Sequence, residues 1–304
     1  MRALIVGCSG QDGHYLTRLL TSARVAVVGV SRREGPTGGI DVADRKAVDE
    51  LVNALRPDYV FHLAARSTTR HEALFDNHDA ISTGTLNILE AVRLHAPEAR
   101  VFLTGSGVQF RNTGAPIAET DEFEPSSPYS VARIHSVYAS RYFRRLGIRT
   151  YVGYLFHHDS PRRGAGHVSS IIASAAARIA AGSQETLEIG DVTVEKEWTF
   201  AGDVAAGIWT LVRQDACTEA AIGSGVAYRI RDWLEVCFTA AGLDWTKHVR
   251  VKRGFTPEYQ RLVSKPDSIH ALGWQPQVSF IELARMMVDA ELARLNSARA
   301  RGDQ

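Results

Sequence analysis

Short apolar runs alternate along the chain with segments whose apolar positions recur at helical spacing. Strands are predicted where these runs occur, at 2–6, 25–30, 59–63, 101–103 and 150–156. Helices are predicted at 44–55, 81–94 and 128–146, and in the segment that carries Tyr15, Leu16, Leu19 and Leu20 on one face. Strands that alternate with helices indicate βαβ units, so the pattern predicts an α/β fold built on a doubly wound parallel sheet.

The pattern becomes less regular after residue 160. Helices are predicted at 171–181 and 279–295 with short strands between them, and residues 298–304 are expected to fray. We therefore predict a first domain over 1–160, to which part of 190–225 returns, and a smaller mixed α/β domain over 161–304. No internal repeat or low-complexity linker divides the sequence.

The composition of the 304 residues is that of an ordinary globular protein. Hydrophobic residues make up 45% and charged residues 23%, which argues against disorder and fibrous repeats. Lys and Arg number 35 against 34 Asp and Glu, and the net charge of +1 argues against a nucleic-acid partner.

Three cysteines, Cys8, Cys217 and Cys237, are scattered through the sequence without metal-ligand spacing. This pattern predicts neither a disulfide framework nor a bound metal, and it fits a reducing, cytoplasmic location. We expect no secretory signal, because the first strand begins at residue 2. We expect no membrane partner, because no apolar run reaches the length of a transmembrane helix.

A glycine-rich turn links the first strand to the first helix. Gly7, Gly10 and Gly13 follow the spacing GxxGxxG there. Glycines at such a turn let the backbone approach a pyrophosphate, and the helix N-terminus adds amide hydrogens and partial positive charge. The alternative is a plain strand-to-helix turn. We favour a dinucleotide site, whose predicted residues here are Gly7, Ser9, Gly10, Gln11, Asp12 and Gly13.

The end of the second strand distinguishes between dinucleotides. An acidic residue at this point would bind the adenosine ribose of NAD, but the chain has Arg32 and Arg33. Arginines suit a 2′-phosphate, so we predict NADP in preference to NAD, the alternative being a solvated basic loop. Asp41 and Val42 are expected to contact the adenine. Asp41 is equally suited to capping a helix, and Asp44 is a candidate N-cap.

Tyr129 and Arg133 lie four residues apart in the predicted helix at 128–146 and therefore share one face. A cation beside a phenol favours the phenolate, so Tyr129 is a candidate acid or base for a hydride-transfer reaction. Most pairs at this spacing are surface contacts. This pair gains weight from the hydroxyls of Thr104 and Ser106, which follow a predicted strand upstream.

These motifs together resemble the extended short-chain dehydrogenase/reductases, over nearly the whole chain. The resemblance rests on the glycine loop, Leu63-Ala64-Ala65, Gly84-Thr85-Leu86-Asn87 and Ser127-Pro128-Tyr129. Within that family, Gly10-Gln11-Asp12-Gly13 and the segment 156–164 are most similar to the GDP-mannose 4,6-dehydratases, as are 187–203 and 272–276. The GDP-4-keto-6-deoxymannose reductases are similar over the same regions.

The resemblance implies a Rossmann-type N-terminal domain that binds NADP and a C-terminal domain that binds a GDP-linked nucleotide sugar. It implies that the cofactor site is also lined by Leu63, Ala64, Ala65, Tyr129 and Arg133. It further implies a homodimer whose interface is formed by the helices at 81–94 and 128–146. Substrate contacts are expected from His157, Arg162, Arg163, Lys196, Trp198 and Arg253.

The chain departs from the family at residues that carry chemistry. The lysine of the YxxxK motif is Arg133 here, which keeps the charge but has a planar, bulkier head group. The Thr-Ser-Glu segment of the dehydratases aligns with Gly105, Ser106 and Gly107, so the acid that protonates the departing water is missing. This argues against 4,6-dehydration by the usual route.

The substrate end is altered as well. His157 replaces an asparagine, Lys196 replaces an arginine, and a further arginine of the family aligns with Thr256. Arg253 and Arg261 are nearby candidates for its role. Together these changes indicate a different sugar, a different step or reduced activity.

The hypothesis that we favour from the sequence is an NADP-dependent reductase of a 4-keto GDP-sugar, in which Tyr129 donates the proton. In this hypothesis Ser106 or Thr104 binds the C4 oxygen, and Arg133 holds the nicotinamide ribose.

Two alternatives stay open. One is a divergent dehydratase or epimerase whose missing acid is replaced by His157, His158 or Asp159. The other is a catalytically weak nucleotide-binding protein. Net consumption of NADPH would separate the reductase from the dehydratase or epimerase.

Overall fold

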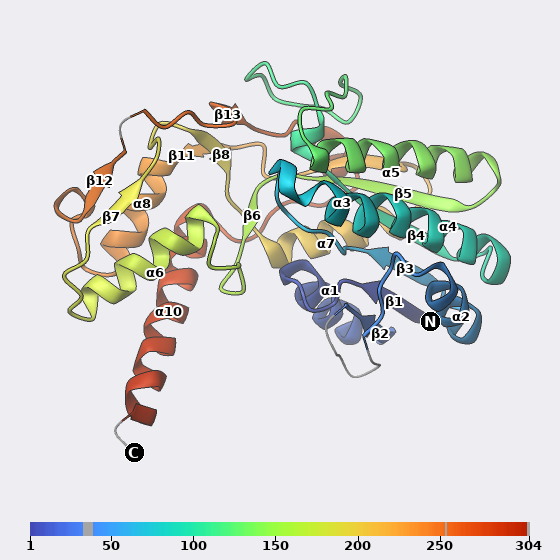
Figure 1. Cartoon of the computed structure of the whole chain (residues 1–304), viewed down its shortest axis with the longest axis horizontal. Coiled ribbons are helices and arrows are strands. Elements are labelled where there is room, and N and C mark those ends of the chain that lie inside the picture. Colours follow the sequence, from blue (N-terminus) through green and yellow to red (C-terminus); the bar gives the residue numbers. More distant parts are fainter. Residues whose placement is uncertain (33–38, 253, 303–304) are drawn as a thin grey trace.

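The computed structural model describes residues 1–32, 39–252 and 254–302. Six parallel strands form the central sheet in the order β10-β5-β4-β3-β1-β2 (Figure 1). They are β1 (Arg2–Val6), β2 (Ala26–Val30), β3 (Tyr59–His62), β4 (Arg100–Ser106), β5 (Arg149–Leu155) and β10 (Glu219–Ile222). The strand order reverses beside β1, so the predicted doubly wound, Rossmann-type sheet is confirmed.

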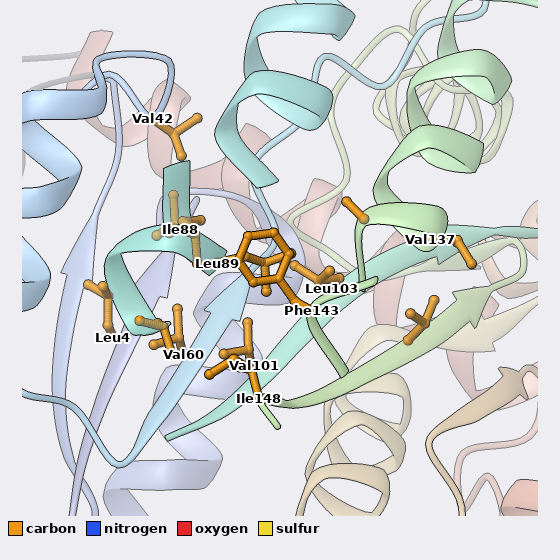
Figure 2. Close-up of a cluster of buried hydrophobic side chains, with 14 of the residues drawn as sticks. Leu4, Val42, Val60, Ile88, Leu89, Val101, Leu103, Val137, Phe143 and Ile148 are labelled. Atoms are coloured by element: carbon orange, nitrogen blue, oxygen red, sulfur yellow. The ribbon is translucent and has the colours of Figure 1, made fainter. Parts of the chain in front are cut away.

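Helices cover both faces of this sheet (Figure 1). One face carries α2 (Arg45–Leu55), α4 (Gly84–His95) and α5 (Pro128–Arg145), and the other carries α1 (Gln11–Ser22) and α7 (Ala201–Val212). Leu4 of β1 packs under the first group of helices, with Ile88 and Phe143 (Figure 2), whereas Ile5 packs under the second. Burial on both faces explains why the strands are continuous apolar runs in the sequence.

The beginning of α2 was predicted from the local sequence, whereas the beginning of α4 was not. Asp44 is the N-cap of α2, and its carboxylate accepts hydrogen bonds from the amides of Lys46 and Ala47 at 2.9 and 3.1 Å, so this predicted cap is confirmed. The helix predicted at 81–94 is different. A π-helical segment, His78–Thr83, precedes α4, so the α-helix proper begins only at Gly84.

The second half of the chain builds a smaller unit of three packed helices and short strands. The helices are α6 (Val168–Ala180), α8 (Ile230–Ala240) and α10 (Phe280–Gly302). The strands are β6 (His158–Asp159), β7 (Leu187–Ile189), β8 (Glu195–Glu197), β9 (Thr199–Phe200), β11 (Ala227–Arg229), β12 (Val249–Val251) and β13 (Arg261–Leu262). β11, β8 and β13 form one small sheet, and β12 pairs with β7.

Three expectations for this half were wrong. Neither α7 nor α8 was predicted, and α10 continues to residue 302, where fraying from 298 was expected; residues 303–304 lie outside the described part. α7 was missed because Val204, Ile208 and Leu211 are accompanied by buried residues on its other sides, which removes the amphipathic period.

The chain passes between the two units more than once. After β6 and the first part of the smaller unit, α7 returns to pack on α1, and β10 pairs with β5 at the edge of the large sheet. None of the helices in the described part of the chain is long and apolar enough to cross a membrane.

Candidate active site

The loop after β1 brings its backbone close to neighbouring chain segments. Gly7 has φ of +94°, and a Cβ added to it would lie 2.7 Å from the amide nitrogen of Ala64. A Cβ on Gly13 would lie 2.6 Å from the carbonyl oxygen of Gly7. Gly10 is the N-cap of α1 and provides no side-chain cap, which leaves the first amides of the helix free to meet an anion.

A cavity of about 270 Å³ lies beside this loop. Nine of the predicted cofactor residues line it: Gly7, Ser9, Gly10, Arg32, Asp41, Val42, Leu63, Ala64 and Ala65. Arg66, which was not predicted as a cofactor residue, also lines this cavity, and its Nη1 lies 3.1 Å from Asp76 Oδ2. Arg33 is outside the described residues. The cavity therefore combines the glycine loop with an exposed arginine, Arg32.

Tyr129 and Arg133 lie together on one face of α5. The helix begins after Ser127, whose hydroxyl accepts a hydrogen bond from the amide of Ser130. The guanidinium carbon of Arg133 is 5.0 Å from the centre of the Tyr129 ring. Arg133 is only 2% exposed, and its Nη1 donates a 2.6 Å hydrogen bond to the carbonyl oxygen of Thr104. The cation is thus fixed between the phenol and the end of β4.

The two hydroxyls at the end of β4 have different partners. Thr104 donates to the carbonyl oxygen of His62 at 2.9 Å. Ser106 accepts a hydrogen bond from the amide of Gln109, while its own amide donates to Gln109 Oε1 at 2.8 Å. The proton of the Thr104 hydroxyl is therefore committed to the backbone, whereas that of Ser106 is available to a substrate oxygen.

Gly107 lies against an aromatic ring. A Cβ added at this position would be 2.8 Å from Cε1 of Phe156, which is 3% exposed. The ring occupies the space that a longer side chain at position 107 would enter. The Phe156 ring therefore occupies the space beside Gly107, the residue that aligns with the glutamate of the dehydratases.

A larger cavity, of about 660 Å³, opens beside Tyr129. It shares Leu63 with the cavity at the glycine loop, so the two adjoin. Its ionisable lining residues are Asp12, Arg70, Tyr129, Arg133, His157, His158, Arg163, His167, Glu258 and Tyr259. Thr104 and Ser106 line it too, so the four predicted catalytic residues meet at one cavity.

His157, Asp159 and Arg163 form a buried group at one wall of this cavity. His157 Nδ1 donates to the carbonyl oxygen of Glu197 at 2.8 Å, and burial lowers the pKa of its ring to about 3. Asp159 Oδ1 accepts a 2.8 Å hydrogen bond from Ser169 and lies 3.2 Å from Arg163 Nε. The wall therefore presents a neutral imidazole and a guanidinium that is held by a buried carboxylate.

His158 joins the two halves of the sequence. Its Nε2 lies 2.9 Å from Asp12 Oδ1, and its Nδ1 lies 2.7 Å from the carbonyl oxygen of Phe156. Burial lowers the pKa of His158, but the Asp12 carboxylate outweighs burial and leaves this pKa above its usual value. The pKa of Asp12 is correspondingly lowered, although its own burial acts in the opposite direction.

The other predicted substrate residues are dispersed. Lys196 lines a neighbouring cavity of about 220 Å³, and burial lowers its pKa to about 8. Trp198 is 3% exposed and stacks on Trp233 at a ring distance of 4.3 Å, so it belongs to the core of the smaller unit. Arg162 is exposed beside α1, and Arg253 lies outside the described residues.

Glu258 and Tyr259 lie between these cavities, and no role was predicted for either residue from the sequence. Both line the large cavity and the one that contains Lys196. Thr69, from the loop after β3, donates to Glu258 Oε2 at 3.4 Å. The segment 254–260 has no periodic pattern, and the only signal for it was the arginine of the family that aligns at Thr256.

The sequence matches a family of known proteins over most of its length. The family model described as GDP-mannose 4,6 dehydratase matches residues 4–287. GDP-mannose 4,6 dehydratase 1 of Arabidopsis thaliana is 32% identical, over 95% of this chain and 89% of that protein. GDP-mannose 4,6 dehydratase of Homo sapiens is 28% identical, over 97% and 92% respectively.

Solved structures show the same fold at lower identity. RMD from Pseudomonas aeruginosa, complexed with NADPH, has a TM-score of 0.85 and 22% identity, with 96% of this chain and 99% of that chain covered. UDP-glucose 4-epimerase from Thermus thermophilus, complexed with NAD, has a TM-score of 0.82 and 24% identity, with the same coverage.

Proposed function

The chain belongs to the GDP-mannose 4,6-dehydratase family, a branch of the extended short-chain dehydrogenase/reductases, and from this premise we propose that it is an enzyme that modifies a GDP-linked nucleotide sugar. The observation that carries the proposal is the Tyr129–Arg133 pair in a cavity that adjoins the glycine loop. A phenol beside a fixed cation is suited to exchange a proton with a sugar hydroxyl or ketone.

We propose NADP as the cofactor. A bound nicotinamide dinucleotide supplies or accepts a hydride. The backbone at Gly7 and Gly10 would hold its diphosphate, Arg32 its 2′-phosphate, and Arg133 its nicotinamide ribose. The complexes of RMD with NADPH and of the epimerase with NAD support a nicotinamide dinucleotide in this fold. Arg32 is the feature that favours the phosphorylated form.

The first candidate reaction is 4,6-dehydration. Dehydration is the activity in the names of the relatives that match nearly the whole chain, and this favours it over the reduction predicted from the sequence. In this reaction Ser106 would hold the C4 oxygen and Tyr129 would exchange its proton. Protonation of the departing hydroxyl would have to come from another group in the cavity wall, for which Glu258 is the candidate, because Asp12 pairs with His158 and the pKa of His157 is lowered to about 3.

The second candidate is reduction of a 4-keto sugar. It is favoured by one observation, the Phe156 ring packed on Gly107 where the dehydratases have their acid. Reduction needs a proton at the C4 oxygen only, which Tyr129 can supply, and needs no acid at position 107.

One experiment separates the two candidates. Purified protein is incubated with NADPH and GDP-4-keto-6-deoxymannose, and in parallel with GDP-mannose and NADP, while nicotinamide absorbance and product mass are followed. Dehydration predicts loss of one water from GDP-mannose without net change in the cofactor. Reduction predicts loss of NADPH and a product two hydrogens heavier. No reaction in either mixture would contradict both candidates as stated and would direct the search to other sugar nucleotides.

A further inference from the structure

The beginning of α1 is tied to the segment around β6 by three hydrogen-bonding contacts. Ser160 donates to Gln11 Oε1 at 2.7 Å, and Gln11 Nε2 donates to the carbonyl oxygen of His158 at 3.4 Å. The His158 ring in turn contacts Asp12. These contacts join residues almost 150 positions apart in the sequence, at the boundary between the large sheet and the smaller unit.

The partners of His158 define its protonation state. The carbonyl oxygen of Phe156 can only accept, so Nδ1 must carry a proton to make the 2.7 Å contact. The pKa of Asp12 is lowered, so its side chain is a carboxylate, which can only accept; Nε2 therefore carries a proton in its 2.9 Å contact with Asp12. A neutral imidazole has one such proton. The contacts, together with the raised pKa of His158, therefore indicate an imidazolium that is paired with an ionised Asp12.

Asp12 lies where a bound dinucleotide would bring negative charge. It is the second residue of α1, whose open N-terminus follows the glycine loop, and it lines the larger cavity. Such a helix end attracts a diphosphate. An unpaired carboxylate in its first turn would repel the same group.

Other charges around His158 are already committed. Arg163 lies 3.2 Å from Asp159 Oδ1, and its Nη2 contacts His167 Nδ1 at 2.9 Å. His157, a further titratable neighbour, is held by the carbonyl oxygen of Glu197, and its Nε2 lies 3.3 Å from Asp159 Oδ2. His158 is therefore the cation that directly pairs with Asp12 in the described part of the chain.

We propose that His158 is a positioning residue for the dinucleotide: its imidazolium neutralises Asp12, so that the N-terminus of α1 accepts the diphosphate while β6 is held beside it. This rests on the dinucleotide site of the proposed function but not on which sugar is modified. The ring itself, with both N–H groups engaged, is not a proton donor to the substrate.

The test measures NADPH affinity by fluorescence as a function of pH, with no sugar present. In the wild-type protein the affinity should fall as the pH rises above the raised pKa of His158. His158→Gln should weaken binding by about tenfold or more and abolish this pH dependence, because Asp12 is left unpaired. The double variant Asp12→Asn/His158→Gln should restore most of the affinity and remain independent of pH.

A matched control is available in the chain. His95 Nε2 lies 2.8 Å from Asp49 Oδ1, which reproduces the pair far from either cavity. His95→Gln should leave NADPH affinity and its pH profile unchanged, and circular dichroism should show that each variant is folded. Unchanged affinity and pH dependence in His158→Gln, or failure of the double variant to recover, would overturn the proposal. If the folded wild type binds neither NADPH nor NADH, the proposed function itself fails, and the two outcomes are distinguishable.

Discussion

Arg133 uses both properties of its side chain, charge and shape. Its guanidinium lies along the Tyr129 ring and also donates to the carbonyl oxygen of Thr104. A lysine ammonium would keep the charge but lacks the planar group of several N–H donors that contacts both the ring and the backbone here. The departure from the family's YxxxK motif is therefore accommodated by specific contacts.

Tyr129→Phe should lower kcat by about 100-fold or more while NADPH affinity stays within about twofold, because only proton exchange is removed. Arg133→Lys should lower kcat by a smaller factor, since a cation remains beside the phenol. Steady-state kinetics with the active sugar nucleotide, together with NADPH fluorescence, provide the measurement. Wild-type turnover by Tyr129→Phe would contradict the assigned role, and full activity in Arg133→Lys would mean that the site uses charge alone.

Lys196 should make substrate binding depend on pH. Burial lowers its pKa to about 8, so the ammonium is charged below this pH and neutral above it. The KM for the nucleotide sugar should therefore rise as the pH increases through about 8, approaching about tenfold per pH unit if only the charged form binds. Lys196→Arg should abolish this rise and keep a low KM, whereas Lys196→Met should have a high KM throughout. A wild-type KM that is flat across this range would contradict the prediction.

Gly107→Ala should destabilise the fold by about 1–3 kcal/mol, because the new methyl group would press on the buried Phe156 ring. Gly166→Ala is the control, since a Cβ there has no neighbour within 4 Å. Urea unfolding of both variants gives the comparison. Equal stability of Gly107→Ala and wild type would show that the ring moves aside freely and that position 107 can hold a side chain.

The sequence was informative where the relevant residues are close together along the chain. Tyr129 and Arg133 are one helical turn apart, and the three glycines lie in one turn, so spacing alone was enough to group them. The Asp12–His158 pair spans 146 positions, and only the folded chain reveals it. Likewise, nothing local in the sequence shows that the Thr104 hydroxyl is directed to a backbone carbonyl.

Among the elements of the large sheet, β1 to β5 and the helices α1, α2, α4 and α5 were predicted from their patterns, whereas β10 and α7 were not. α7 is buried around most of its circumference and therefore has no amphipathic period. The π-helical segment before α4 packs against α5 along much of its length. No residue pattern in the sequence predicts this segment, because its shape depends on that packing.

Asp44→Ala should lower the free energy of unfolding by about 1 kcal/mol, because two amides at the beginning of α2 lose their acceptor. Thermal unfolding measures this loss, and Asp44→Ser should retain most of the wild-type free energy of unfolding, because a serine hydroxyl can also cap the helix. Asp41→Ala is a useful comparison, since Asp41 accepts a bond from the Ala43 amide outside the helix. A loss in Asp41→Ala as large as that in Asp44→Ala would contradict the assignment of the cap.

At the scale of the whole molecule, α4 and α5 leave an apolar stripe open on the surface. Val131, Tyr138 and Tyr142 of α5 lie at helical spacing and are 48%, 59% and 59% exposed. Leu86 and Leu94 of α4 are 41% and 50% exposed. Exposed large apolar side chains on two neighbouring helices are typical of interfaces, and the homodimer predicted from the family resemblance stays our expectation.

Light scattering should give the mass of a dimer, and Leu94→Glu combined with Tyr142→Glu should give a folded monomer, because charges on both helices would oppose their burial. Val251→Glu changes an equally exposed apolar residue on β12, away from the stripe, and should remain dimeric. A wild-type monomer at micromolar concentration would contradict the prediction.

The return of α7 and β10 to the large sheet has a consequence for synthesis on the ribosome. Five of the six strands and the helices on one face are complete once residue 155 has emerged, but the edge of β5 is then unpaired and α1 lacks its neighbouring helix α7. Both are supplied by residues 201–222. A nascent chain thus exposes an open strand edge and an uncovered apolar face until the first part of the smaller unit has been made, and this interval is when it most needs a chaperone.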